Sequence, residues 1–268
     1  MDDLAKIRDS YINEGMSYAQ AEARCAQDAI LDLIAKSALI ANITIKGGVL
    51  MQHVSKDARR ATTDFDLDFV RYPIADASIK KFVKTLDTGS SAFSIKLAGN
   101  IEELKHQDYS GKRIYVIISD AQGNSIESKV DIGVHALVSP DLEDICFDLT
   151  KLDESVTLLA DSNEQMVAEK LRSLLRIGAA STRYKDVFDI YYLLIVKGVD
   201  PEKLDDALAA LVFNDPSMRE GGYGDIAKRL QSVFSNRRFS SQLPRAKNDW
   251  LEVSPAKATS AIVGYFSE

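Results

Sequence analysis

Cysteine, histidine and proline are scarce in this chain, and long apolar runs are absent from it. Its 268 residues include 2 cysteines, 3 histidines and 6 prolines. Because Cys25 and Cys146 have no CxxC spacing and no adjacent histidine, we expect two reduced core thiols and not a metal or redox site. Without a run of about 18 uncharged apolar residues, the chain is not expected to cross a membrane. Its charged N-terminus lacks the apolar core of a signal peptide, which favours a cytoplasmic protein.

Positive charge is also in deficit. The formal net charge of −7 argues against a protein that coats nucleic acid without specificity. Local basic groups remain, and each is open to two interpretations, a ligand contact or a solvated face. These groups are Arg59 with Arg60, Lys80 and Lys81 with Lys84, Arg172 with Arg176, and Arg237 with Arg238. The three histidines, at 53, 106 and 135, do not form a ligand set, and we expect them in the core or on the surface.

Periodicity predicts the elements of secondary structure. Apolar residues at helical spacing predict helices, and strict alternation predicts strands. In the first half we expect helices over 4–39, from 49 and over 74–86, and strands over 43–45, 64–70, 93–97, 113–120, 125–136 and 145–149. Turn residues at 121–124 predict a hairpin. Beyond residue 152 the pattern is almost entirely helical, and we expect helices over 162–177, 185–197, 201–213, 223–235 and 255–265.

These elements predict an α+β fold in two domains. Residues 1–155 are expected to form a mixed sheet with flanking helices, including those at the N-terminus. Residues 156–268 are expected to form a helical domain.

A glycine pair and an acidic strand attract attention in the first domain. Gly47 and Gly48 end a short strand, where backbone N–H groups and a following helix N-terminus suit a phosphate chain. An ordinary tight turn explains the same pair. Asp64 and Asp66 share one face of the next strand, where their repulsion raises proton affinity and favours a cation. Asp68 shares that face one pleat further on, and a solvated acidic edge is the alternative interpretation.

Asp131 offers a third carboxylate. It lies between Val130 and Ile132 on the later strand of the hairpin, so we expect it beside the first pair in the sheet. Carboxylate oxygens in a small cluster suit Mg²⁺, with Mn²⁺ as a substitute. Three carboxylates around Mg²⁺ activate an attacking hydroxyl and stabilise leaving pyrophosphate. The sequence thus predicts metal-binding Asp64, Asp66 and Asp131, with Asp131 as a candidate base.

Four motifs in order resemble one family, and together they cover roughly residues 40–195. The family is that of AbiEii-type toxins, the nucleotidyltransferase component of type IV toxin–antitoxin and abortive-infection systems. The matching positions are Lys46, Gly47, Gly48 and Leu50; Arg60, Thr62, Asp64, Asp66 and Leu67; Ala168 to Leu171; and Arg183 to Tyr191. Val49 departs from the pattern, since serine or threonine is common there, and the acidic pair lies further from the glycines than usual.

The resemblance implies roles for further residues. It implies nucleotide binding by Lys46, Gly47 and Gly48, with Arg60 and Thr62 either touching a phosphate or holding the acidic strand. Lys170 would offset phosphate charge, and Asp186 would orient Lys170 or the incoming hydroxyl. An exposed helix lysine and a helix-start aspartate are the structural alternatives. We interpret Asp189 and Arg183 as structural, and Asp189 has Lys185 four residues before it as a possible ion-pair partner.

The resemblance also implies an activity. The nucleotide would lie in the cleft between the domains, and a nucleoside monophosphate would pass from an NTP to a hydroxyl of RNA, such as the tRNA 3′ end. Growth arrest would follow, and a cognate antitoxin is the expected protein partner, with RNA contacted by basic residues of the helical half. Two other classes stay open: an enzyme of this fold that modifies a small molecule or a protein hydroxyl, and a non-catalytic nucleotide-binding partner module.

Overall fold

The structure, a computed structural model, divides the chain into two compact units. They span Met1–Asp161 and Ser162–Glu268, and each is described by itself. The structure describes residues 3–87, 89–104, 111–134, 142–245 and 249–267. About 52% of the chain is helical and 22% is strand, which confirms the predicted α+β class.

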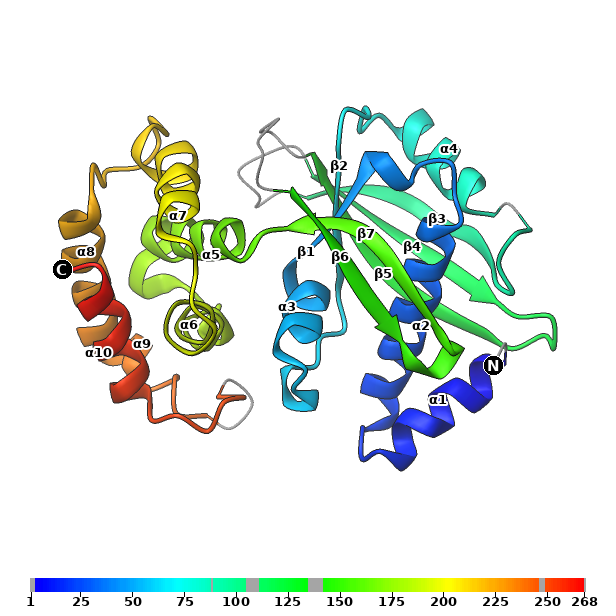
Figure 1. The fold of residues 1–268 in the computed structure, drawn as a ribbon, viewed down its shortest axis with the longest axis horizontal. Coiled ribbons are helices and arrows are strands. Elements are labelled where there is room, and N and C mark those ends of the chain that lie inside the picture. The colour runs from blue at the N-terminus through cyan, green and yellow to red at the C-terminus, as the bar shows by residue number, and fades with distance from the viewer. Residues whose placement is uncertain (1–2, 88, 105–110, 135–141, 246–248, 268) are drawn as a thin grey trace. The chain divides into compact units, whose positions relative to one another are not determined.

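A seven-stranded mixed sheet forms the first unit in the part of the chain that is described (Figure 1). Its strand order is β3-β4-β5-β2-β1-β7-β6. The strands are β1 (Ile43–Lys46), β2 (Phe65–Phe69), β3 (Ser94–Leu104), β4 (Gly111–Ser119), β5 (Ser125–Val134), β6 (Leu142–Leu149) and β7 (Glu154–Asp161). β4 and β5 pair antiparallel through Ser119 and Ser125, which confirms the predicted hairpin. β2 pairs parallel with β5, and β1 pairs parallel with β7.

Alternation along β2 explains how this strand is held. Phe65, Leu67 and Phe69 are almost fully buried and alternate with the aspartates. The ring of Phe69 lies 5.1 Å from that of Phe82, which belongs to α4 (Asp76–Leu86). The face of β2 with Phe65, Leu67 and Phe69 therefore packs into the core. Because side chains alternate along a strand, the aspartates lie on the opposite face.

The N-terminal helical segment is two helices and not the single one predicted over 4–39. α1 spans Leu4–Asn13 and α2 spans Tyr18–Ala35. Gly15 between them has a φ of +96°, which favours glycine and ends the first helix. Ser17 then caps α2 in a reciprocal arrangement with Gln20, a signal that is visible in the sequence.

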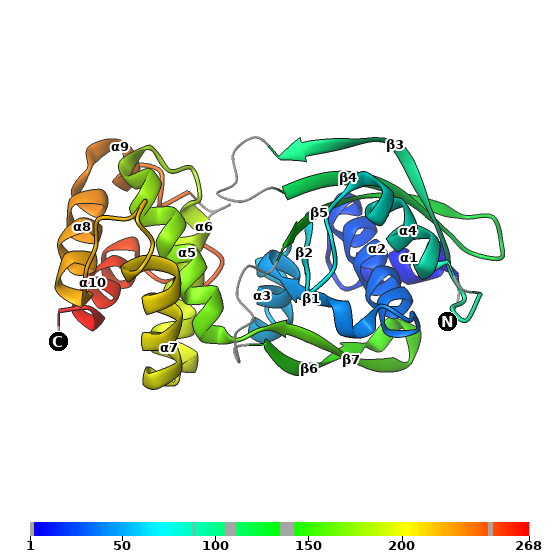
Figure 2. The same cartoon turned by 90° about the horizontal axis from the view of Figure 1, so that it is seen from above.

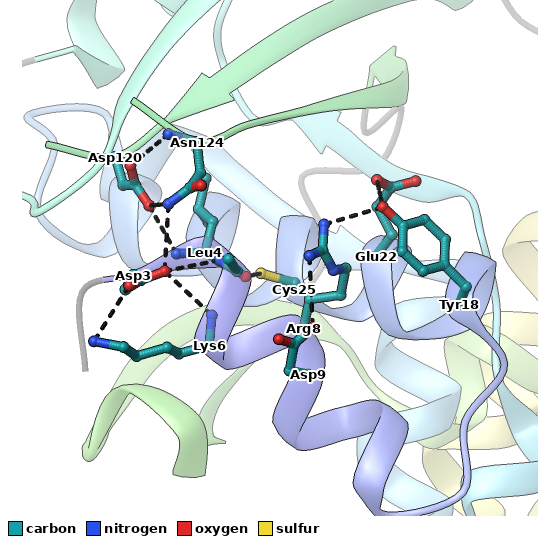
Figure 3. A network of polar contacts seen from close by, with 11 residues as sticks. Asp3, Leu4, Lys6, Arg8, Asp9, Tyr18, Glu22, Cys25, Asp120 and Asn124 are labelled. Atoms are coloured by element: carbon teal, nitrogen blue, oxygen red, sulfur yellow. Dashed lines mark hydrogen bonds and ion pairs between the residues drawn. The ribbon is translucent and has the colours of Figure 1, made fainter. Parts of the chain in front are cut away.

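A polar network ties α1 to the β4–β5 hairpin (Figure 3). The Asp3 side chain caps the first turn of α1, and the Leu4 N–H donates to Asp120 Oδ2 over 2.9 Å. Asn124, in the hairpin turn, donates to the same carboxylate over 2.8 Å. Although burial opposes it, these donors lower the pKa of Asp120. The turn thus anchors the helix N-terminus to the sheet.

Strand β7 is an element that the sequence analysis missed. Val156, Leu158 and Ala160 are buried and alternate along it, so the period-two signal is present but short. β7 joins the sheet beside β1, where Ile45 pairs with Ala160. Cys146, on the neighbouring β6, is exposed, so the prediction of two core thiols is wrong for it; Cys25 is buried, and both are free.

The second unit is helical, as predicted. Its helices are α5 (Asn163–Ile177), α6 (Tyr184–Tyr191), α7 (Pro201–Leu208), α8 (Tyr223–Ser235), α9 (Arg237–Ser240) and α10 (Pro255–Tyr265). Wider π-helical turns continue α6 to Lys197 and α7 to Phe213, so both reach the lengths predicted. The short α9 was not predicted. Large side chains from several helices, Phe188, Phe239 and Phe266 among them, are buried and form a second core. None of the described helices combines the length and the apolar character that a membrane crossing requires.

Candidate functional site

The sheet register brings together side chains that are far apart in the sequence. Lys46 at the end of β1 pairs with Asp66 on β2, and Asp66 pairs with Asp131 on β5. The row continues to Arg113 on β4, the register partner of Asp131. Four neighbouring strands therefore present Lys46, Asp66, Asp131 and Arg113 in one line, and Asp131 lies beside the β2 pair as predicted.

The glycine turn packs directly against this row. α3 (Gly47–Ser55) begins immediately after Lys46, and Gly47 has a φ of +65°. A Cβ on Gly47 would overlap the carboxylate of Asp66, with Cγ at 2.9 Å, and a Cβ on Gly48 would lie 2.6 Å from Thr62 Oγ1. The backbone N–H of Gly48 donates to the Asp66 carboxylate. The turn that was predicted to meet a phosphate therefore also fixes Asp66.

Replacing Gly47 by alanine should destabilise the protein more than the left-handed conformation alone requires. Gly99 is a matched control, since its φ is +68° and nothing lies within 4 Å of an added Cβ. We expect Gly99→Ala to cost about 1–2 kcal/mol from backbone strain. Gly47→Ala should cost a further 1–3 kcal/mol, roughly, because Asp66 must shift. Urea unfolding followed by circular dichroism measures both, and equal losses would exclude a tight contact between Gly47 and Asp66.

Asp66 is the most perturbed carboxylate of the row. Burial, with the neighbouring carboxylates of Asp131 and Asp64, raises the pKa of Asp66 to about 6 against the opposing charge of Lys46. We predicted a raised proton affinity from repulsion between Asp64 and Asp66. The direction is confirmed, but loss of solvent is the larger cause. A positive charge bound near Asp66, at the centre of the row, would therefore be stabilised by these carboxylates.

Two basic side chains pair with the outer carboxylates. Arg113 donates from Nε and Nη2 to the two oxygens of Asp131, over 2.7 and 2.8 Å. Lys129 Nζ lies 2.5 Å from Asp64 Oδ1, and the Asp64 side chain is 48% exposed. Sequence reasoning missed both cations. Lys129 lies two residues before Asp131 and so shares its face of the strand, whereas Arg113 is brought close only by the pairing of β4 with β5.

Lys46 and Asp68 form a third, more buried ion pair at the β1 end of the row. Lys46 Nζ lies 2.9 Å from Asp68 Oδ2, and the two residues are 8% and 2% exposed. Asp68 pairs in register with Thr44, whose hydroxyl lies 3.4 Å from Asp161 Oδ1. Asp68 is therefore not part of a solvated acidic edge, and it holds Lys46 in place next to Asp66.

The segment before β2 is held from several sides. Thr62 Oγ1 accepts from the Asp64 N–H over 3.3 Å, and Gln27 Nε2 donates to the Thr62 carbonyl over 2.9 Å. Arg60 is 5% exposed and ends a short 3₁₀ turn. Thr62 thus holds the acidic strand, one of its two predicted roles. His53 contacts the ring of Phe147, with centroids 4.6 Å apart, while His106 and His135 lie outside the described residues.

The second unit has its own charged cluster. Lys170 Nζ lies 2.8 Å from Asp186 Oδ1 and 2.8 Å from Asp189 Oδ2. The lysine side chain is 12% exposed and that of Asp189 is fully buried, so the alternative of an exposed helix lysine is wrong. Trp250 Nε1 donates to Asp189 over 2.9 Å. Asp186 therefore contacts Lys170 as the resemblance implies, and Asp189 pairs with Lys170 and Trp250.

Within the described residues, no three histidine, cysteine or acidic side chains are arranged as a preformed metal site. No curated protein matches this chain at a significant level. The model of one protein family does match, over residues 29–255, and it is described as nucleotidyl transferase AbiEii toxin of type IV toxin–antitoxin systems. The match covers the acidic row, the glycine turn and the lysine cluster of the second unit. This chain therefore belongs to the AbiEii family of nucleotidyltransferase toxins.

Proposed function

We propose that this protein transfers a nucleoside monophosphate from an NTP to a hydroxyl group of RNA. The hydroxyl oxygen would attack the α-phosphorus, a new P–O bond would form, and the bond to the β-phosphate would break. Pyrophosphate would leave and the hydroxyl proton would pass to a carboxylate. The observation that carries this proposal is the alignment of Lys46, Asp66 and Asp131 beside the glycine turn.

The carboxylates fit a divalent cation by the chemistry of their oxygens and by the raised pKa of Asp66. Asp64, Asp66 and Asp131 would hold Mg²⁺, or Mn²⁺ in its place, and the ion would neutralise phosphate charge when bound. Arg113 and Lys129 now supply positive charge to Asp131 and Asp64. Both would have to release these carboxylates, and Asp131, once released, is the candidate base.

The remaining residues would bind and orient the nucleotide. Lys46 is fixed by Asp68, so its charge is positioned and not flexible. Gly47 and Gly48 bring backbone close to the row without a side chain in the way. Lys170, oriented by Asp186, would offset the negative charge that develops on the phosphates. Arg60 and Thr62 would support the acidic strand from behind.

The type IV toxin–antitoxin family implies a cognate antitoxin as a partner. For the acceptor, we propose the tRNA 3′ end, with growth arrest as the outcome.

Separate incubations with four α-labelled NTPs, Mg²⁺ and total tRNA test the proposal. We expect label from at least one NTP to appear on RNA, with release of unlabelled pyrophosphate. Parallel reactions should contain a cell extract treated with ribonuclease, which retains protein and small-molecule acceptors. Label there but not on RNA would show that a different hydroxyl is the acceptor, and label in neither would support a non-catalytic module.

A further inference from the structure

Two segments of the helical unit contain no acidic residue. Residues 172–185 contain three arginines and one lysine, and residues 226–245 contain four arginines and one lysine. The cations are Arg172, Arg176, Arg183 and Lys185, followed by Lys228, Arg229, Arg237, Arg238 and Arg245. All 40 aspartates and glutamates of a chain with net charge −7 lie outside these segments. Both segments therefore carry a net positive charge, whereas the chain as a whole is acidic.

The two segments pack against each other (Figure 2). The 3₁₀ turn Gly178–Ala180, which follows α5, contacts both α8 and α9. Arg229 on α8 donates from Nε to the Leu175 carbonyl over 3.3 Å. The rings of Tyr184 and Phe239 lie 5.2 Å apart and join the start of α6 to α9. Arg176, Arg183, Arg229, Arg237 and Arg238 therefore lie on segments that meet at the C-terminal end of α5, and we call these five residues the basic face.

The basic face is directed to solvent. Arg183, Arg229, Arg237 and Arg238 are all exposed. Two cations of these segments pair with carboxylates from outside them, Arg172 with Asp215 and Lys228 with Asp225. Neither segment contains an acidic residue of its own, so the exposed guanidinium groups of Arg183, Arg237 and Arg238 raise the local positive potential. A surface of this kind suits a partner with many regularly spaced negative charges.

We propose that the basic face binds the phosphate backbone of the acceptor RNA, an inference that rests on the proposed function. Arginine forks match phosphate oxygens in a bidentate manner, and arginine dominates this face. Arg176 also follows Lys170 on the same helix by six residues, roughly 9 Å along its axis. An RNA strand held at the basic face would therefore pass within about two turns of Lys170. Charge and position together favour RNA over an acidic protein.

The test uses the full chain and purified tRNA, with EDTA present and NTP absent, so that binding is measured without transfer. The triple variant Arg183→Gln, Arg237→Gln and Arg238→Gln removes three charges from the face. A matched control, Lys80→Gln, Lys81→Gln and Lys84→Gln, removes three exposed charges from α4 in the other unit. Fluorescence anisotropy over a range of salt concentrations gives the dissociation constant and its salt dependence. Thermal unfolding followed by Trp250 fluorescence checks that each variant is folded.

We expect the arginine variant to bind tRNA about 10–100-fold more weakly and to lower the salt slope by about 2–3. The lysine control should stay within about twofold of wild type. Equal losses in both variants would show that binding depends on net charge alone. Unchanged binding in the arginine variant would show that tRNA does not contact the basic face. Either result overturns the inference. Transfer assays at saturating tRNA separate the two proposals. Weakened tRNA binding by a folded arginine variant, with no transfer to RNA by wild type, would overturn the proposed function and leave only RNA binding by the basic face standing.

Discussion

Replacing Asp66 by asparagine is expected to stabilise the first unit at pH 7.5 in the absence of metal. Burial and two neighbouring carboxylates raise the pKa of Asp66 from 3.8 to about 6, so ionising this group costs more in the folded protein than in the unfolded chain. The difference amounts to about 3 kcal/mol above pH 6, as an upper limit because the side chain is only partly enclosed. Asparagine keeps an oxygen for the Gly48 N–H and carries no charge.

The pH dependence follows from the sign of this shift. Below pH 3.8 Asp66 is protonated in both states, so wild type and Asp66→Asn should be equally stable with respect to this group. As the pH rises towards 6, the unfolded chain ionises first and wild type loses stability. The advantage of Asp66→Asn should be about 1 kcal/mol at pH 4.5 and should reach its full value above pH 6.

Differential scanning calorimetry in EDTA at pH 4.5 and 7.5 measures the effect. Asp144→Asn, at an exposed position on β6, is a matched control that should change stability by less than about 0.5 kcal/mol. A variant Asp66→Asn that is destabilised at pH 7.5 would show that the carboxylate is a structural ligand of the Gly47–Gly48 turn and not an unfavourable charge.

Lys170→Met should cause the largest loss of stability in the second unit. The ammonium group lies 2.8 Å from each of two buried carboxylates, and Asp189 is fully buried. Removing one partner from a buried ion pair typically costs about 3–5 kcal/mol, because the remaining charge stays out of water. The double variant Lys170→Met and Asp189→Asn should recover part of this loss, because the asparagine oxygen still accepts from Trp250.

Trp250 makes the measurement selective. It is the only tryptophan of the chain and it contacts Asp189, so its fluorescence during urea unfolding reports on the second unit. Lys257→Met, at an exposed position on α10, should change the unfolding free energy by less than about 0.5 kcal/mol. A loss below about 1 kcal/mol for Lys170→Met would mean that Lys170 is not required to neutralise this cluster.

Local periodicity was enough to predict most elements of this fold. The alternation in β2 and the turn residues at 121–124 led to the correct strands and hairpin, since burial on one face imposes a period of two. The helices of the second unit were predicted within a few residues. The signals that we overlooked were short: the Ser17–Gln20 cap that separates α1 from α2, and three alternating apolar residues in β7.

Contacts in the site that depend on the register of the sheet could not be predicted from the sequence. Asp64 and Asp66 share a face because they lie two residues apart, and this is visible in any strand. The pairing of Arg113 with Asp131 requires β4 to lie next to β5 in one particular register. The contact of Lys170 with Asp186 was expected from the family resemblance, but its burial with Asp189 and Trp250 arises from packing between helices that no local pattern describes.

The row of Lys46, Asp66, Asp131 and Arg113 contains one carboxylate, Asp66, whose charge is unfavourable for folding. The raised pKa of Asp66 implies an unfavourable charge at neutral pH; the Gly48 N–H donates to this carboxylate, and the absence of a Cβ on Gly47 leaves room for it. Arg113 and Lys129 offset part of the charge of its neighbours. Such an arrangement is typical of active sites, where perturbed groups serve chemistry and not stability.

The most direct test is to compare nucleotidyl transfer by wild type and Asp66→Asn, with Mg²⁺, α-labelled NTPs and total tRNA. Asp144→Asn serves as the control for a lost negative charge. We predict that wild type and Asp144→Asn label RNA at similar rates, while Asp66→Asn is slower by roughly 10³-fold although it is folded. Labelling of RNA by Asp66→Asn at a rate near that of wild type would contradict the assignment of this carboxylate to the catalytic centre.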